Sequence, residues 1–322
     1  MMEGIRNILV GVALVGRTVA IPPGSRNAFD QAIRLAKDLG ARLTILHSTW
    51  VDEGFEPLDG EARTGVSPGR LDLPDEGRAL LAGLASEARE HGLACELEVA
   101  QDRPWIAAIQ AVLSGRADLV IVGKRDGVQG RGRRLGNVAA KLIRKCPAPL
   151  WVVKPDHDLV HKLVLAATEL RAVGRLAVEY AGFVAACHAG ELHVVHAFQL
   201  PPELELRSAS LSEDDHAAEI DAFREERQTR LLAEMAESGI PGVPEVHVLR
   251  NEPSGAIRET VEHLHPDLLV MGSLSRCGAG FRFVGPFMGT TAERLLDRVD
   301  CSMLMLKPAE FVSPVALDAA SR

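Results

Sequence analysis

The sequence predicts an α/β fold built from two similar tandem domains, each a parallel sheet with helices on both faces. Apolar runs and amphipathic stretches alternate along the 322 residues. The apolar runs are unbroken, as expected of strands that are covered on both faces. The segment 267–308 also repeats the pattern of the segment 118–155, which indicates an internal duplication.

The first half shows five apolar runs of strand length. They lie at residues 5–13, 43–47, 93–99, 119–122 and 150–153. We expect one helix to be capped by Ser25 and ended by Gly40, and a second to run to about His91. A third is expected to be capped by Asp102, with Pro104 in its first turn.

The second half restarts the same order after Lys154-Pro155. Its apolar runs lie at residues 163–167, 192–198, 246–249 and 268–271, with a last run before Lys307-Pro308. Helices are expected over 169–189, over a long acidic stretch of about 212–238, and from Pro253 onward.

The two halves correspond at fixed offsets. Pro104 and Asp118 match Pro253 and Asp267 at an offset of 149 residues. The Lys-Pro pairs that end the halves match at an offset of 153. A repeat of this length is a duplicated domain, so we expect domains at 1–156 and 157–322.

A glycine-rich loop follows the fourth strand of each half and leads into a helix. Ligands of parallel sheets bind beyond the carboxyl ends of the strands, where both loops are expected to lie. In the second half the helix starts at Thr290 and Thr291. Orphan N–H groups at such a helix start favour an anion.

Each half resembles a universal stress protein domain. The pattern that carries the resemblance is a glycine, two residues, a second glycine, nine residues, then Gly-Ser or Gly-Thr before a helix and a strand. The whole chain resembles the tandem two-domain members. The resemblance implies two Rossmann-like, adenine nucleotide alpha hydrolase-like domains, each with a five-stranded parallel sheet, whose final strands pair the two halves. Members of this family are stress-induced cytoplasmic proteins, of which some bind ATP and others do not.

Both loops depart from that pattern. In the first half Gly123 and Gly136 match, but Asp126 replaces the second glycine and Asn137 the hydroxyl residue. The negative charge of the Asp126 carboxylate would repel a phosphate bound in this loop. In the second half Gly272, Gly289 and Thr290 match, but Ser275 replaces the second glycine. The gap from Ser275 to Gly289 is thirteen residues instead of nine.

Nucleotide-binding members also carry an acidic residue at the end of strand one, which meets the adenine. The matching positions here are interpreted as Ala13 and Thr168, and neither is acidic. The resemblance therefore makes the second half the better candidate for an anion or nucleotide, and makes ATP doubtful, with Mg²⁺ only if ATP binds. The candidate residues are Gly272, Ser275, Gly289, Thr290, Thr291 and Thr168, with Gly123, Gly136 and Asn137 as the weaker set of the first half.

Composition excludes several classes of function. The net charge of −8 argues against nucleic-acid binding, and the N-terminal apolar run is too short for a membrane span. The five cysteines form no paired motif, which indicates free thiols in a reducing compartment and a cytoplasmic location. The segment 124–145 is strongly basic, which fits a solvated face, a phosphate clamp or a contact with the acidic segment 203–226.

No metal or catalytic constellation emerges from the spacing. The histidines near His157 and His193 have the wrong spacing for ligands within one element, so we expect no metal site. Cys277 beside Arg276 is interpreted as an incidental small residue rather than a reactive thiol. The predicted function is a non-catalytic stress-response protein that binds a small phosphate-bearing or apolar ligand. The alternatives are a weak ATP hydrolase or phosphoryl-transfer protein and a ligand-free scaffold. We expect the halves to pair within the chain, and the sequence leaves homo-oligomers open.

Overall fold

The structure is a computed structural model. It describes residues 2–15, 19–51, 69–70, 72–124, 136–155, 159–203, 205, 212–237, 240, 242–273, 290–296 and 298–317. The chain divides into two compact units. The N-terminal unit holds mainly residues 3–159 together with 302–317, and the C-terminal unit holds mainly 160–273 together with 290–301. The predicted boundary at 156/157 stays a prediction.

The N-terminal unit is a six-stranded part of a sheet in the order β12-β7-β6-β1-β2-β5. Its strands are β1 (Asn7–Gly11), β2 (Arg42–Ser48), β5 (Cys95–Ala100), β6 (Leu119–Gly123), β7 (Leu150–Val153) and β12 (Ser302–Leu306). All neighbours are parallel except β12, which runs antiparallel to β7 with Met303 opposite Val152. The final strand of the second half thus belongs to the unit that the first half builds.

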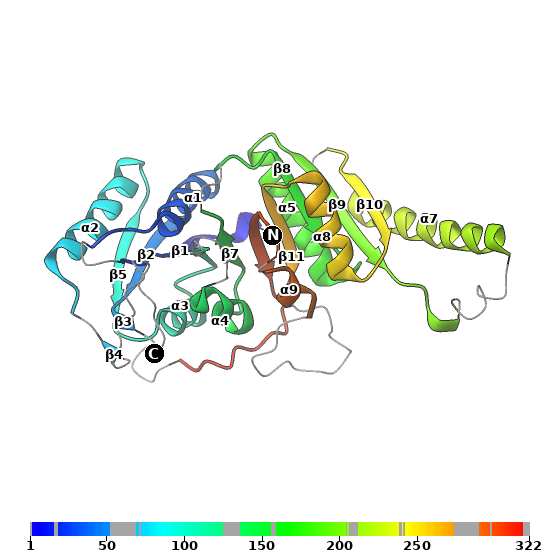
Figure 1. Cartoon of the computed structure of the whole chain (residues 1–322). Helices are drawn as coiled ribbons and strands as arrows, with labels where there is room; N and C mark the ends of the chain where they lie inside the picture. Colours follow the sequence, from blue (N-terminus) through cyan, green and yellow to red (C-terminus); the bar gives the residue numbers. More distant parts are fainter. Residues whose placement is uncertain are drawn as a thin grey trace. The chain divides into compact units, whose positions relative to one another are not determined.

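Four helices accompany these strands. They are α1 (Pro23–Leu39), α2 (Asp75–Glu90), α3 (Pro104–Leu113) and α4 (Asn137–Lys145); a short turn η1 (Met2–Gly4) and a two-stranded ribbon of β3 (Trp50–Val51) and β4 (Gly69–Arg70) complete the unit. Helix α1 packs on β1, β6 and β7 (Figure 1). The core is apolar and close-packed, and Trp151 and Phe29 are its largest fully buried side chains.

The C-terminal unit has the strand order β10-β9-β8-β11, and all neighbours are parallel. Its strands are β8 (Leu163–Ala167), β9 (Glu191–Phe198), β10 (Glu245–Arg250) and β11 (Leu268–Gly272). Its helices are α5 (Ala172–Cys187), α7 (Glu213–Glu237), α8 (Pro253–Leu264) and α9 (Thr290–Leu295). Helix α5 packs on β8 and β11, and α8 packs on β9 (Figure 1). The predicted α/β class, with five strands from each half, is therefore confirmed.

The repeated Asp-Leu dipeptide has the same structural task in both halves. A carboxylate oxygen of Asp118 accepts bonds from the backbone N–H groups of Arg6 and Asn7, each at 2.9 Å. Asp267 accepts the corresponding bonds from Lys162 and Leu163 at 2.6 and 2.9 Å. Each aspartate thus fixes the start of the first strand of its half against the start of the fourth.

Two predicted helix caps are wrong. Ser25 lies inside α1, which starts at Pro23, and its Oγ accepts a bond from the Ala13 N–H at 3.0 Å. Asp102 is not the residue before α3, because Arg103 holds that position, and Asp102 accepts from the Arg103 N–H. Proline in the first turn fixes the backbone angle φ at a helical value, and it has no N–H group that needs a partner. These helices therefore start without a side-chain cap. The predicted stop at Gly40 is confirmed, since Gly40 has a φ of 62°.

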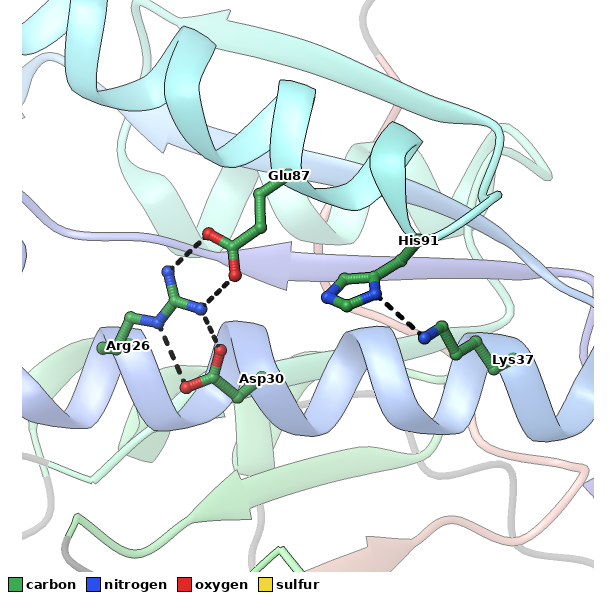
Figure 2. A network of polar contacts seen from close by, with 5 residues as sticks. All are labelled: Arg26, Asp30, Lys37, Glu87 and His91. Atoms are coloured by element: carbon green, nitrogen blue, oxygen red, sulfur yellow. Dashed lines mark hydrogen bonds and ion pairs between the residues drawn. The ribbon is translucent and has the colours of Figure 1, made fainter.

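Polar contacts join α1 and α2 along their exposed side (Figure 2). Arg26 donates to Glu87 at 2.8 Å and to Asp30, one turn along its own helix, at 3.1 Å. Hydrogen bonding to Arg26 lowers the pKa of Glu87. Lys37, near the end of α1, and His91, the residue after α2, make a second contact at 3.0 Å. Both contacts connect the carboxyl end of α2 to α1.

Candidate functional site

The carboxyl end of the sheet in the C-terminal unit brings two of the predicted site residues to one edge. Ala167 and Met271 are register partners on β8 and β11, so Thr168 and Gly272 follow them at the same edge. Gly272 is buried, and Thr168 is only 7% exposed. This edge is the position at which parallel sheets bind ligands.

Thr168 is held by three hydrogen bonds. Its N–H donates to the Val195 carbonyl at 3.0 Å, and its Oγ1 accepts from the Leu170 N–H at 3.1 Å. Its carbonyl accepts from Nδ1 of His196 at 2.9 Å. Both backbone groups of Thr168 thus have partners in the protein, and its hydroxyl oxygen accepts one bond while its O–H can still donate.

The same bonds define the structural counterpart of Thr168 in the first half, which is Val12. The Val12 N–H donates to the Leu46 carbonyl at 2.9 Å, and its own carbonyl lies 2.9 Å from Nδ1 of His47. The residue after Val12 is Ala13, and the residue after Thr168 is Glu169. The structural counterpart of Ala13 is thus Glu169, so the interpretation that pairs Ala13 with Thr168 is shifted by one residue.

Glu169 is half-buried in the short segment that leads from β8 into α5. Burial raises the pKa of its carboxyl, while hydrogen bonds from backbone N–H groups, including that of Gly174, oppose the rise. Gly174 allows this approach, since a Cβ built there would lie 2.3 Å from Thr168 Oγ1 and 2.9 Å from a Glu169 carboxylate oxygen. Sequence reasoning missed Glu169, although an acidic residue next to the assigned position was a visible signal.

A pair of buried histidines was also missed. His47 and His196 are each the sixth residue of their strands, β2 and β9, and lie 149 residues apart. That offset is the one that relates Asp118 to Asp267. Each Nδ1–H donates to a backbone carbonyl at the end of the first strand, so Nε2 carries the lone pair. Burial lowers the pKa of both rings, which keeps them neutral.

Of the weaker candidate residues in the first half, Gly123, Gly136 and Asn137, the structure explains why the first is a glycine. A Cβ on Gly123 would lie 2.1 Å from the Gly24 carbonyl oxygen, and a Cβ on Gly24 would lie 2.4 Å from the Lys124 carbonyl oxygen. The first turn of α1 therefore rests directly on the end of β6. Gly136 precedes α4, and Asn137 is its exposed first residue.

The remaining predicted residues divide between the described and the other segments. Thr290 is the first residue of α9, and Thr291, the second, is partly exposed. Ser275, Gly289 and Cys277 lie outside the described residues, as do residues 125–135 of the basic segment. Among the described residues no helix is long and apolar enough to span a bilayer.

Comparison with known proteins agrees with this architecture. The model of the universal stress protein family matches residues 5–154 and again residues 161–307. Universal stress protein E of Escherichia coli K12 is 28% identical over 265 residues, which cover 76% of this chain and 82% of that protein.

Two crystal structures share the fold. A protein of unknown function from Pseudomonas aeruginosa PAO1 has a TM-score of 0.66 at 20% identity, covering 96% of this chain and 95% of its own. A universal stress protein from Archaeoglobus fulgidus has a TM-score of 0.59 at 18% identity, covering 94% and 98%. Because the family model matches each half separately, the chain belongs to the universal stress protein family and carries two tandem domains of that family.

Proposed function

We propose that this chain is a non-catalytic, cytoplasmic binding or regulatory protein of the stress response, and that its second half holds a small phosphate-bearing ligand such as an adenine nucleotide. The observation that carries the proposal is the identity of the second residue after the first strand of each half. It is Glu169 in the second half and Ala13 in the first. An acidic residue at this place is what the family resemblance associates with adenine recognition.

The chemistry of Glu169 suits that role. A carboxylate oxygen can accept a hydrogen bond from an exocyclic amino group, and a protonated carboxyl can donate one to a ring nitrogen. Burial raises the pKa of Glu169, which favours the protonated form relative to an exposed glutamate. Thr168, which precedes Glu169 in the sequence, lies at the same edge of the sheet as Gly272. In this proposal Ser275, Gly289, Thr290 and Thr291 face the phosphate.

The first half gives a contrast within the same chain. Its strand-one position is Ala13, and Gly123 is used for the close contact with Gly24. Asp126 adds a negative charge in the loop that would face phosphate. These features favour a first half that serves structure and a second half that binds the ligand.

Titration of the full chain with AMP, ADP and ATP, with and without Mg²⁺, tests the proposal. A ligand that binds the folded state raises Tm as its concentration exceeds Kd. The expected result is a shift that Glu169→Ala weakens by about tenfold in Kd, which corresponds to about 1.4 kcal/mol. Because Glu169 also contacts the start of α5, the Tm of the unliganded variant must be measured beside the binding.

Two charge variants distinguish the halves without disturbing the helices. Thr291→Glu and Asn137→Glu each place a carboxylate in the first turn of a helix, where it favours folding and repels phosphate. We expect only Thr291→Glu to abolish the shift. Loss through Asn137→Glu alone would assign the ligand to the first half. Mg²⁺-dependent release of phosphate would indicate the hydrolase, and the absence of any shift would indicate the scaffold.

A further inference from the structure

Four charged or titratable side chains gather on the edge strand β10 of the C-terminal unit and on its neighbour β9. Each strand contributes a Glu-x-His sequence, Glu191-Leu-His193 on β9 and Glu245-Val-His247 on β10. The strands are parallel, and Glu245 is the register partner of His193. Residues two apart on a strand share a face, so His247 lies on the same face as Glu245.

The distances within this cluster are those of a chelating group. Nδ1 of His193 lies 3.0 Å from Nε2 of His247, and the two rings stack with centroids 5.3 Å apart. The Glu245 carboxylate oxygens lie 3.8 Å from the first nitrogen and 4.0 Å from the second. Three potential ligand atoms thus lie within 4.8 Å of one another.

We propose that His193, Glu245 and His247 form a site for a divalent transition-metal ion, with Zn²⁺ as the best fit. With Zn–N bonds of about 2.0–2.1 Å and tetrahedral angles, two ligand nitrogens lie about 3.3–3.4 Å apart. The ring nitrogens need to separate by a few tenths of an ångström, and the nearly parallel rings need to tilt so that both lone pairs point at the ion. Two imidazoles and one carboxylate leave the fourth position to water, as in open zinc sites.

The surroundings of the cluster favour this use. The His193 side chain is buried, while the Glu245 side chain is 67% exposed and can rotate onto the ion. Nε2 of His193 lies 3.7 Å from the Glu191 carboxylate, on the ring edge away from the ion. This is an ion-pair distance, and a small rotation of the exposed Glu191 side chain would let its carboxylate accept the Nε2 proton and leave Nδ1 to the metal.

The first half supplies an internal control for the alternative that these histidines merely complete the sheet. The positions 149 residues earlier are Thr44, Glu96 and Glu98, and Thr44 is paired with Glu96 in the same register. Glu98 there forms an ion pair with Arg116. The same pair of strands forms without histidines, so the fold does not require them.

The site is separate from the proposed ligand edge. Glu191 and Glu245 are the first residues of β9 and β10, whereas Thr168 and Gly272 follow or end their strands. Neither proposal depends on the other.

The test is Zn²⁺ binding by the full chain after chelator treatment, followed by calorimetry and by metal analysis of the dialysed protein. We expect one tightly bound equivalent, and a Co²⁺ form with the intense visible absorption of a tetrahedral site. Glu191→Gln should weaken binding by about 10–100-fold, as expected for a carboxylate that orients a ligating histidine. His247→Gln, at a partly exposed position, should weaken it further.

The control is His265→Asn, which removes an exposed histidine of the same unit at a φ of 49° that asparagine tolerates. It should bind Zn²⁺ like the unchanged chain. Unfolding curves without metal establish that each variant is folded, and His193→Gln is interpreted only if it is. Absence of Zn²⁺ binding, or binding that His247→Gln and Glu245→Gln leave unchanged, would overturn the proposal and leave the 3.0 Å contact as a hydrogen bond between two neutral rings.

Discussion

Gly24 and Gly123 lie backbone to backbone, with the carbonyl oxygen of Gly24 in the space that a Cβ of Gly123 would occupy. A Cβ there would lie 2.1 Å from this oxygen and 2.3 Å from the carbonyl carbon. Both neighbours are backbone atoms, which cannot rotate away as a side chain can. The first turn of α1 and the end of β6 are therefore set by the absence of two side chains.

Gly123→Ala should destabilise the protein by about 1–3 kcal/mol, the usual effect of an overpacked interior. Denaturant unfolding of the two proteins measures the difference. Gly83→Ala is the matched control, because Gly83 lies in α2 and a Cβ there meets no atom within 4 Å. That control should gain about 0.5–1 kcal/mol, since alanine is the better helix former. Equal effects of the two substitutions would contradict the close contact.

Asp118→Ala and Asp267→Ala should each lower the free energy of unfolding by about 1–3 kcal/mol, because two backbone N–H groups lose their acceptor. Hydrogen exchange should locate the loss at the starts of β1 and β8. Asp118→Asn keeps one acceptor oxygen and should recover part of the stability. A neutral effect of both alanine variants would show that water replaces the carboxylates.

The duplication made much of the fold predictable from sequence. The offset of 149 residues assigned Asp118 and Asp267 to equivalent strands, and the structure gives both the same bonds. The unbroken apolar runs predicted buried strands because burial on both faces leaves no alternation. The offset also relates His47 to His196, so this signal was present but unused.

Tertiary contacts explain what the sequence did not predict. Ser25 has a side chain typical of helix caps, but the helix starts earlier, at Pro23. The Ser25 hydroxyl instead accepts a hydrogen bond from the Ala13 N–H. The register of β8 against β9 decides that Glu169 corresponds to Ala13, and a single sequence leaves that position uncertain by one residue. The cluster of His193 and His247 joins residues 54 apart, which spacing rules for one element do not cover.

His196→Gln should make stability less sensitive to acid. Burial lowers the pKa of His196 from its ordinary 6.5, so the folded state binds fewer protons than the unfolded state below that value. The contribution of the neutral His196 ring to the free energy of unfolding is complete above pH 6.5 and decreases as the pH falls below that value. Glutamine can donate to the Thr168 carbonyl without titrating. Tm measured between pH 7.5 and about 5 should fall less steeply in the variant, and an unchanged slope would exclude His196 as a source of acid sensitivity.

Lys307 directly follows β12 and lies in an unusual environment for a cation. It is only 7% exposed, and its Nζ has no hydrogen-bond partner within the part of the chain that the structure describes. The ammonium lies 4.4 Å from the centre of the Phe311 ring. Burial lowers its pKa from 10.5 to about 8, a change that nearby Cys146 opposes.

Lys307→Met should therefore stabilise the protein near neutral pH. The folded state binds fewer protons than the unfolded state between pH 8 and 10.5, so the stability of the unchanged chain rises with pH through that window. Below pH 8 the unfavourable burial of the charge is fully present, and methionine removes it. The cation–π contact with Phe311 offsets part of the gain, which leaves about 1–3 kcal/mol at pH 7.

The measurement is urea unfolding of both proteins at pH 7, 8, 9 and 10. The advantage of Lys307→Met should shrink as pH rises above 8, because the unchanged lysine then loses its proton in the folded state. Lys162→Met is the control, since Lys162 is exposed and its contribution to folding is its backbone N–H bond to Asp267. A destabilised Lys307→Met protein would mean that Phe311 and the fixed dipoles near β12 stabilise the ammonium more than burial disfavours it.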